Sequence, residues 1–424
     1  MKTNSKILVN NTIMMYILSI TKLVIPLISL PYLTRVLTKD CYGSISFVKS
    51  LINYMQILID FGFLLSATKD IIHVMKKGEL PNKVIGDTLY AQVLLCLLSM
   101  LIITICCFSF KLLRGYEFYT FLSLIPIMLS IFLFEYVFKA YEQMGKIAIR
   151  YVVMKVLALI LTIIFVKNDG DIYLIPIFDI ISSVVAVAMV FIQLKKLDVK
   201  FSFSFKRIKQ ALSCLKDAFT YFISNFATTA FSILNTLIIG VMLTKADVAD
   251  WNVVVQLVTA VQALYNPITN SVFPTMVKEK NLKLIHKIML IYMPLIFIGC
   301  GCVLLLGDWA VELVFTKNYI EASKLLKCLI PVLIFSFPSL LYGWPCLGAI
   351  DKQKATSMTT IISALIQVAG LVLLICIDRF TLVNICIVRN ITEISLATMR
   401  MYLVYKNKKM FTNKSELKNN EQEI

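Results

Sequence analysis

The sequence predicts an all-helical membrane protein in which twelve transmembrane helices form two parallel six-helix lobes around a central cavity. Composition, the distribution of charge and an internal repeat support this fold class. Of the 424 residues, 59% are hydrophobic and 16% are charged, and the mean hydropathy is +0.82. Soluble domains contain roughly 45–50% apolar and 25% charged residues. The chain is therefore expected to have the lipid bilayer as its solvent.

Twelve predominantly apolar segments give the expected spans. About 20 helical residues are needed to cross ~30 Å of hydrocarbon, and a single segment that spans lipid satisfies its own backbone only as a helix. The segments are 9–34, 43–68, 87–110, 118–139, 149–166, 172–194, 217–243, 251–276, 288–306, 324–349, 355–377 and 380–405.

The connectors between these segments set the orientation. With the N-terminus inside, the cytoplasmic connectors hold 27 Lys and Arg residues and the external connectors hold 8. Lys and Arg accumulate on the cytoplasmic side of membrane proteins. This asymmetry predicts a bacterial inner-membrane protein with both termini in the cytoplasm. It also explains the net charge of +17 without nucleic acid as a partner.

The longest connector divides the chain into two lobes. Residues 1–194 form the expected N-terminal lobe and residues 217–405 the C-terminal lobe. Between them, 195–216 contains a basic and apolar pattern that favours an amphipathic helix on the inner leaflet, with a solvated linker as the alternative. The tail, 406–424, is polar and is expected to be disordered in the cytoplasm.

An internal repeat appears when the chain is shifted by 206 residues. Segment 37–58 then lies over 243–264, and seven of the 22 positions are identical. Shared polar residues carry this match, because apolar residues coincide by chance in a membrane protein. Both halves begin on the same side of the membrane, so the repeats are parallel, as in some transporters.

Polar side chains recur on single helix faces inside the spans of both halves. Such residues are costly in lipid unless they face other helices or water. The alternative is hydrogen bonding between helices, but matched stripes in two halves favour a hydrated cavity. The stripes contain Ser19, Ser29, Asn53, Gln56 and Asp60 in the first half, and Asn225, Thr228, Asn235, Thr259, Gln262 and Asn266 in the second.

Four basic residues lie inside the expected spans and are the candidate ligands for an anion: Lys22, Lys49, Lys155 and Arg389. Lys22 is thirteen residues into the first segment, about 20 Å from its start. It cannot easily reach water and needs an anion or a wet cavity. Lys49 and Lys155 lie nearer the membrane surface, so the alternative for them is that their side chains snorkel to water instead of binding an anion. For Arg389 the alternative is mutual neutralisation with Glu393, which is four residues further along the same helix.

Motifs for catalysis or metal binding are not evident. The eleven cysteines form no CxxC pair, and the two histidines, His73 and His286, lie in separate connectors. Asp169-Gly170-Asp171 is interpreted as a turn in a short external connector. The sequence therefore predicts a protein that is not an enzyme and has no metal or cofactor.

The stretch from Asn10 to Asp70 is similar to the start of a known family. The residues that carry the similarity are Lys22, Pro26-Leu27, Pro31-Tyr32-Leu33-Thr34-Arg35-Val36-Leu37, Tyr42-Gly43, Asp60-Phe61-Gly62-Phe63 and Ser66-Ala67-Thr68-Lys69. This pattern resembles the Wzx-type flippases of O-antigen and other polysaccharide repeat units. These form part of the multidrug/oligosaccharidyl-lipid/polysaccharide (MOP) superfamily.

The resemblance implies a MATE-like fold and translocation of an undecaprenyl-pyrophosphate-linked oligosaccharide from the cytoplasmic to the periplasmic leaflet by alternating access. It also implies a polysaccharide polymerase and a chain-length regulator as partners. A multidrug exporter of the same superfamily is one alternative, although segment 9–34 lacks the carboxylate such exporters carry. A lipid II flippase is another, although it usually has two further helices. A membrane scaffold would not need matched polar stripes.

Overall fold

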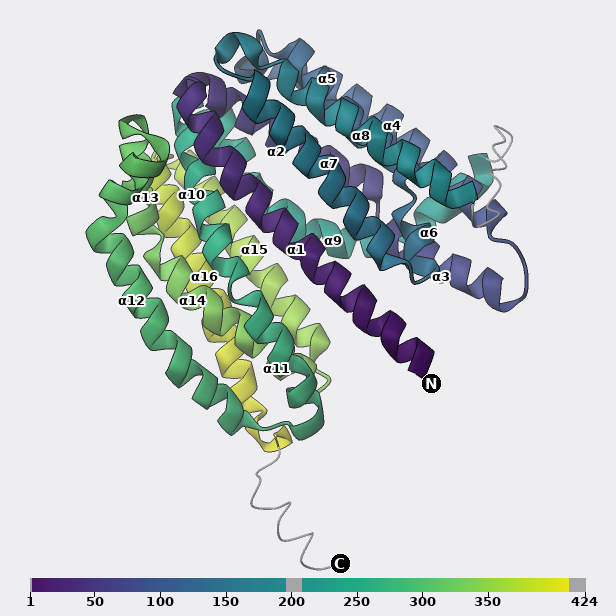
Figure 1. The fold of residues 1–424 in the computed structure, drawn as a ribbon. Coiled ribbons are helices and arrows are strands. Elements are labelled where there is room, and N and C mark those ends of the chain that lie inside the picture. The colour runs from purple at the N-terminus through teal and green to yellow at the C-terminus, as the bar shows by residue number, and fades with distance from the viewer. Residues whose placement is uncertain (1, 196–207, 412–424) are drawn as a thin grey trace, which may run out of the picture. The chain divides into compact units, whose positions relative to one another are not determined.

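The computed structural model describes residues 2–195 and 208–411. Within these residues every regular element is helical, as Figure 1 shows, which confirms the all-helical fold class. The chain divides into two compact units, Met1–Ala249 and Asp250–Ile424. The expected lobe boundaries stay a prediction. The central part of the expected amphipathic linker, 196–207, and most of the tail, 412–424, lie outside the described residues.

Among the residues that the structure describes, nine α-helices begin and end in the first unit, with short 3-10 turns between some of them. They are α1 (Lys2–Val36), α2 (Lys39–Asp60), α3 (Phe63–Lys76), α4 (Asn82–Ser109), α5 (Glu117–Ser130), α6 (Glu135–Ala140), α7 (Met144–Phe165), α8 (Leu174–Lys195) and α9 (Ile208–Met242). The 3-10 turns are η1 (Lys111–Leu113), η2 (Ile131–Leu133) and η3 (Asp169–Asp171).

The second unit contains most of α10, which begins in the first, and the helices that follow it. The helices are α10 (Lys245–Ala263), α11 (Asn266–Glu279), α12 (Leu282–Phe315), α13 (Ile320–Cys328), α14 (Ile330–Leu341), α15 (Gln353–Cys376) and α16 (Leu382–Lys406). The short elements are η5 (Lys317–Tyr319), the π-helical η6 (Tyr342–Gly348) and η7 (Lys408–Met410).

All twelve expected spans coincide with helices. Within the described residues, nine helical stretches are long and apolar enough to cross a membrane. The other three expected spans, 43–68, 217–243 and 251–276, lie in α2–α3, α9 and α10–α11. Two of these are divided by a break, and polar residues lower their hydropathy. The number of twelve spans therefore stays a prediction.

Two spans are broken at corresponding places in both halves of the chain. The second span is interrupted at Phe61 and Gly62, both in left-handed backbone, and its counterpart is interrupted between α10 and α11. The fourth span is interrupted at Phe134 and its counterpart within η6. This shared pattern of breaks supports the internal repeat.

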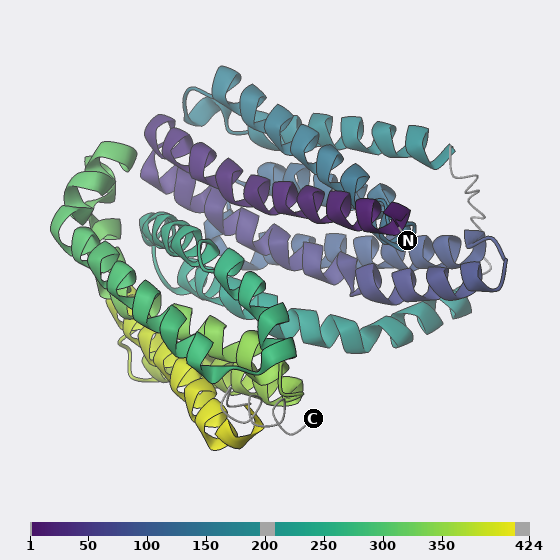
Figure 2. The same ribbon diagram turned by 60° about the horizontal axis from the view of Figure 1, so that its bottom comes forward.

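In the first unit, α1 lies along α7, and α7 packs against α8 (Figures 1 and 2). Near the end of this contact, the Tyr32 hydroxyl is 2.8 Å from the carbonyl of Ile163 and 2.6 Å from that of Val166. The Asp169 carboxylate accepts hydrogen bonds from the Thr38 amide and hydroxyl at 2.8 and 2.5 Å. Asp169-Gly170-Asp171 forms η3, which confirms that this motif is a turn.

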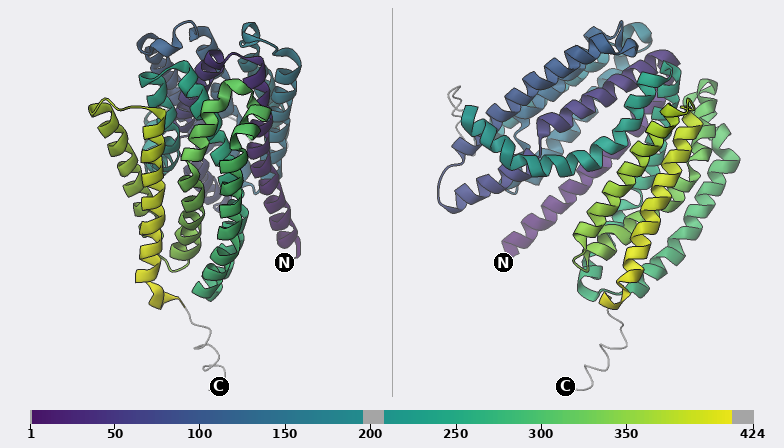
Figure 3. Two further views of the ribbon diagram at one scale, coloured as in Figure 1. Left: turned by 90° about the vertical axis from the view of Figure 1, so that its left-hand side faces the viewer. Right: turned by 180° about the vertical axis from the view of Figure 1, so that it is seen from behind.

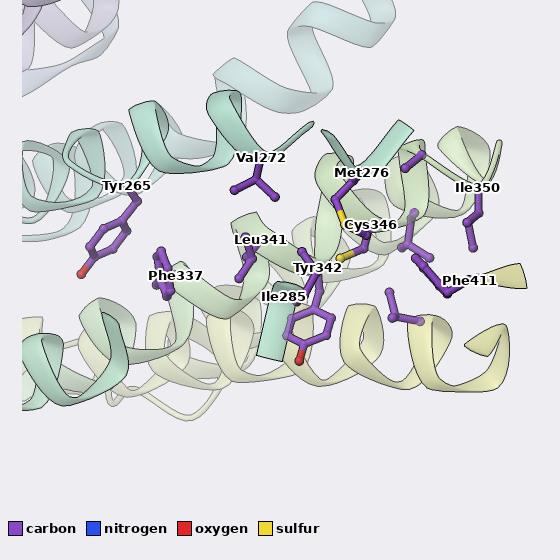
Figure 4. Packing of buried hydrophobic residues seen from close by; sticks show 13 residues of the cluster. Tyr265, Val272, Met276, Ile285, Phe337, Leu341, Tyr342, Cys346, Ile350 and Phe411 are labelled. Atoms are coloured by element: carbon purple, nitrogen blue, oxygen red, sulfur yellow. The ribbon is translucent and has the colours of Figure 1, made fainter. Parts of the chain in front are cut away.

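In the second unit, α16 packs between α14 and α15 (Figure 3). A cluster of buried side chains surrounds the end of α14 and η6, as Figure 4 shows. Tyr265 from the break between α10 and α11 contacts Phe337 with ring centres 5.3 Å apart, and its hydroxyl donates to the Leu333 carbonyl at 3.1 Å. The breaks of the second and fourth spans of this half are therefore packed against each other.

Candidate functional site

A polar cavity of about 420 Å³ lies within the first unit. It is lined by residues of α1, α2, α3, α4, α7 and α8, and by the broken segment from α5 through η2 to α6. Four of the residues singled out from the sequence line it together, namely Lys22, Gln56, Asp60 and Lys155. The cavity therefore collects side chains from spans that are far apart in the sequence.

Three cations line this cavity. They are Lys22 from α1 and both Arg150 and Lys155 from α7. Lys155 lies 3.7 Å from the Asp179 carboxylate on α8. Arg150 lies 3.5 Å from the Glu135 carboxylate on α6. Two of the three cations are thus already close to a carboxylate.

Lys22 differs from the other two cations. Its Nζ is 5.3 Å from the centre of the Tyr151 ring, a cation–π distance. Among the residues that the structure describes, no carboxylate lies within 4.0 Å of it. A fixed ion pair between Lys22 and Asp60 is therefore not present. Lys22 provides a positive charge on the cavity wall that no direct ion pair compensates.

Asp60 occupies a different polar part of the wall. The Gln56 amide nitrogen donates to its Oδ1 at 2.8 Å and lies 3.4 Å from the Ser130 hydroxyl. Gln56 and Asp60 are four residues apart on α2, so the polar face of this helix turns toward α5. The same face carries Asn53 and Lys49, but both are exposed and neither lines the cavity.

Ser19 and Ser29, from the polar face of α1, also stand apart from the cavity. The Ser19 hydroxyl donates to the Met15 carbonyl at 2.9 Å, and the Ser29 hydroxyl to the Pro26 carbonyl at 3.3 Å. A hydroxyl bonded within its own helix is a common way to place Ser in a span. Of the α1 stripe, only Lys22 lines the cavity.

Arg150 lines the cavity but is not among the candidate site residues predicted from the sequence. It lies where the basic connector 139–150 meets the expected span 149–166, and α7 already begins at Met144. Arg150 is 1% exposed, and its Nη1 donates to the Leu133 carbonyl at 2.8 Å. A charged residue at the border of a polar connector and an apolar run carries no sequence signal for burial.

The candidate residues of the second half differ in their burial. Arg389 lies 3.5 Å from Glu393, which confirms the alternative of a pair within α16. Asn235 is buried on α9, Gln262 is half-buried, and Thr259 and Asn266 are exposed. The side chains of Asn225 and Thr228 lie outside the described residues.

Comparisons with known proteins agree with this architecture. A family model described as polysaccharide biosynthesis protein matches residues 8–280. A candidate O-antigen transporter of Shigella dysenteriae is 24% identical over 369 residues, covering 84% of this chain and 90% of that protein.

Solved structures show the same fold. The lipid II flippase MurJ, in an inward closed conformation, superposes with a TM-score of 0.73 at 14% identity, covering 94% of this chain and 87% of that one. An inward-facing MATE family multidrug transporter of the MOP superfamily superposes with a TM-score of 0.62 at 14% identity. This match covers 92% of this chain and 98% of that one. The chain thus has the MATE-like membrane fold, and the proteins it resembles are named transporters and flippases rather than catalysts.

Proposed function

The chain belongs to the polysaccharide biosynthesis protein family, and from this premise we propose that it is a flippase for a lipid-linked glycan. Its substrate is an undecaprenyl-pyrophosphate-linked oligosaccharide, an O-antigen or related repeat unit. The chain moves this unit from the cytoplasmic to the periplasmic leaflet by alternating access of its two lobes. The observation that carries the proposal is Lys22, a mid-span cation on the wall of a polar cavity that makes no direct ion pair with any residue the structure describes.

The chemistry of the substrate fits this cavity. A pyrophosphate that crosses a low-dielectric region needs cations and hydrogen-bond donors in place of water. Lys22 and Lys155 supply cationic donors at the cavity, whereas Arg150 is held by the Leu133 carbonyl and Glu135. The cavity volume of about 420 Å³ falls within the ~300–1,000 Å³ of small-molecule sites. It therefore takes the polar head of the substrate, while the polyprenyl tail remains in lipid.

Within this proposal the pyrophosphate site comprises Lys22 and Lys155, with Lys49 and Arg389 as further cations that meet it along the path. The polar side chains of the second half, from Asn225 to Asn266, contact the neutral glycan. A lipophilic cation is a poor ligand for this site, because its charge would be repelled by Lys22. This argues against the multidrug exporter alternative.

Deletion of the gene tests the function directly. Lipid-linked repeat units are expected to accumulate on the cytoplasmic leaflet, and surface polymer is expected to disappear. Lipid extraction with mass spectrometry and a polymer immunoblot measure the two effects, and complementation with the intact chain is the control. Continued polymer production in a host without a redundant flippase would contradict the proposal, and accumulation of lipid II instead would favour the lipid II flippase alternative.

The orientation is proposed from the charge asymmetry of the connectors, with both termini in the cytoplasm and the chain in the inner membrane. Reporter fusions at residue 424 and within 195–216 are expected to report a cytoplasmic location. A fusion within 307–323 is expected to report a periplasmic one. With 195–216 in the cytoplasm, a periplasmic C-terminus would mean an odd number of spans after this linker and would overturn the twelve-span prediction.

A further inference from the structure

The fourth span of each half is broken, and the break is supported by a buried arginine in both cases. In the first half, η2 ends at Leu133 and Phe134 adopts left-handed backbone with φ 46° and ψ 43°. In the second half, Gly343 within η6 has φ −70° and ψ −113°, which is not helical. A non-glycine residue in the left-handed region is strained, so other contacts must hold it.

Arg150 contacts the break of the first half on both sides of Phe134. Its Nη1 donates to the Leu133 carbonyl at 2.8 Å, and its Nη2 is 3.5 Å from the Glu135 carboxylate. Its guanidinium carbon is 5.5 Å from the centre of the Phe138 ring. In a continuous helix the Val137 amide would donate to the Leu133 carbonyl, but here it donates to Phe134 at 2.9 Å. Arg150 thus satisfies a carbonyl that the break exposes.

Arg400 holds the break of the second half in a similar way. It is 7% exposed, and its Nη1 donates to the Ser339 carbonyl at 2.7 Å. Its Nε and Nη2 donate to the hydroxyls of Thr359 and Thr360 on α15 at 3.2 and 2.9 Å. A Cβ at Gly343 would lie 2.9 Å from Nη1. The absence of a side chain at Gly343 therefore gives the guanidinium its place against the broken backbone.

The two carbonyls occupy equivalent positions in the chain. Leu133 and Ser339 are 206 residues apart, which is the offset of the internal repeat. The two arginines are not equivalent, because Arg150 belongs to α7 and Arg400 to α16. Two arginines from different helices thus bond the same carbonyl of the repeat. An unpaired carbonyl costs several kcal/mol in a bilayer, so both halves share the need for a donor here.

We propose that Arg150 and Arg400 are positioning residues that hold the break in the fourth span of each half. In the first half the broken segment forms one wall of the polar cavity, to which Ser130, Phe134 and Glu135 contribute. Arg150 therefore fixes the shape of that wall. The effect of these arginines on transport rests on the proposed function. Their effect on the local stability of the breaks does not, because that stability can be measured without substrate.

Hydrogen–deuterium exchange of the purified full chain tests the proposal. In Arg150→Met, the amides of 131–138 are expected to exchange about tenfold faster or more, since a charged hydrogen bond is lost. In Arg400→Met, the same is expected for 336–346. Lys155→Met is the matched control for Arg150, because it removes another paired cation of α7 at the same cavity. It is expected to leave 131–138 unchanged.

The remaining outcomes separate positioning from general stability. Unchanged exchange in 131–138 of Arg150→Met would overturn the proposal, as would a uniform increase across the whole first unit. If either Met variant does not accumulate, Arg150→Gln and Arg400→Gln take its place. Gln can still donate to the carbonyl but carries no charge, so exchange near the break is expected to increase by less than tenfold. An increase that spreads evenly over the unit would count against positioning in these variants as well.

Discussion

Replacing Lys22 by alanine is expected to abolish surface polymer while the protein still accumulates in the membrane. The reason is that Lys22 contributes charge to the cavity and makes no direct ion pair within the described residues. Removing Lys22 takes a cation from the pyrophosphate path. It does not break an ion pair with any described carboxylate, so the protein is expected to remain stable. Lys22→Arg is expected to retain partial activity, since it keeps the charge but presents a wider fork of donors.

The measurement combines a polymer immunoblot with an immunoblot of the membrane fraction. Lys111→Ala, at an exposed position in η1 away from the cavity, is the control and is expected to behave like the wild type. Normal polymer from a well-expressed Lys22→Ala variant would exclude Lys22 from the pyrophosphate site. A loss of protein that Asp60→Asn restores would show that the two residues stabilise each other instead.

The location of the helices could be predicted because the bilayer leaves few alternatives. A long apolar segment must be helical in lipid, and every segment marked in the sequence is. The breaks within segments 118–139 and 324–349 were not predicted. Phe134 adopts left-handed backbone although Phe has no preference for it. The cause is a tertiary contact with Arg150, and hydropathy does not report such contacts.

The candidate site was predictable where helix periodicity decided it. Gln56 and Asp60 are one turn apart on α2 and reach the cavity together with Lys22. Periodicity cannot tell whether a hydroxyl donates a hydrogen bond to a carbonyl of its own helix, as the Ser19 hydroxyl does to Met15. It also cannot tell a snorkelling cation from a buried one, and Arg150, at the border of a connector and a span, is buried.

The resemblance pattern contains a glycine whose role becomes clear from packing. Gly43 begins the second turn of α2, where the chain at the start of α10 approaches it. A Cβ at Gly43 would overlap the Lys245 carbonyl oxygen and would lie 2.7 Å from its carbonyl carbon. Real Cβ atoms essentially never come closer than 3.0 Å to such atoms. The contact involves backbone, so no side-chain rotation can relieve it.

Gly43→Ala is therefore expected to destabilise the protein severely. Overpacking in a well-packed core costs about 1–3 kcal/mol when side chains can move, and here two backbone segments must separate. We expect little protein in the membrane fraction and a marked fall in the melting temperature of what is purified.

Gly299→Ala is the matched control for this substitution. Gly299 also lies within a helix, α12, and nothing is within 4 Å of a Cβ placed there. Because alanine favours helices over glycine by up to about 1 kcal/mol, this variant is expected to be as stable as the wild type or more so. Equal melting temperatures for Gly43→Ala and Gly299→Ala would contradict the close approach of α2 to the start of α10. A fall confined to Gly43→Ala would tie the Tyr42-Gly43 motif to helix packing, apart from any contact with the transported glycan.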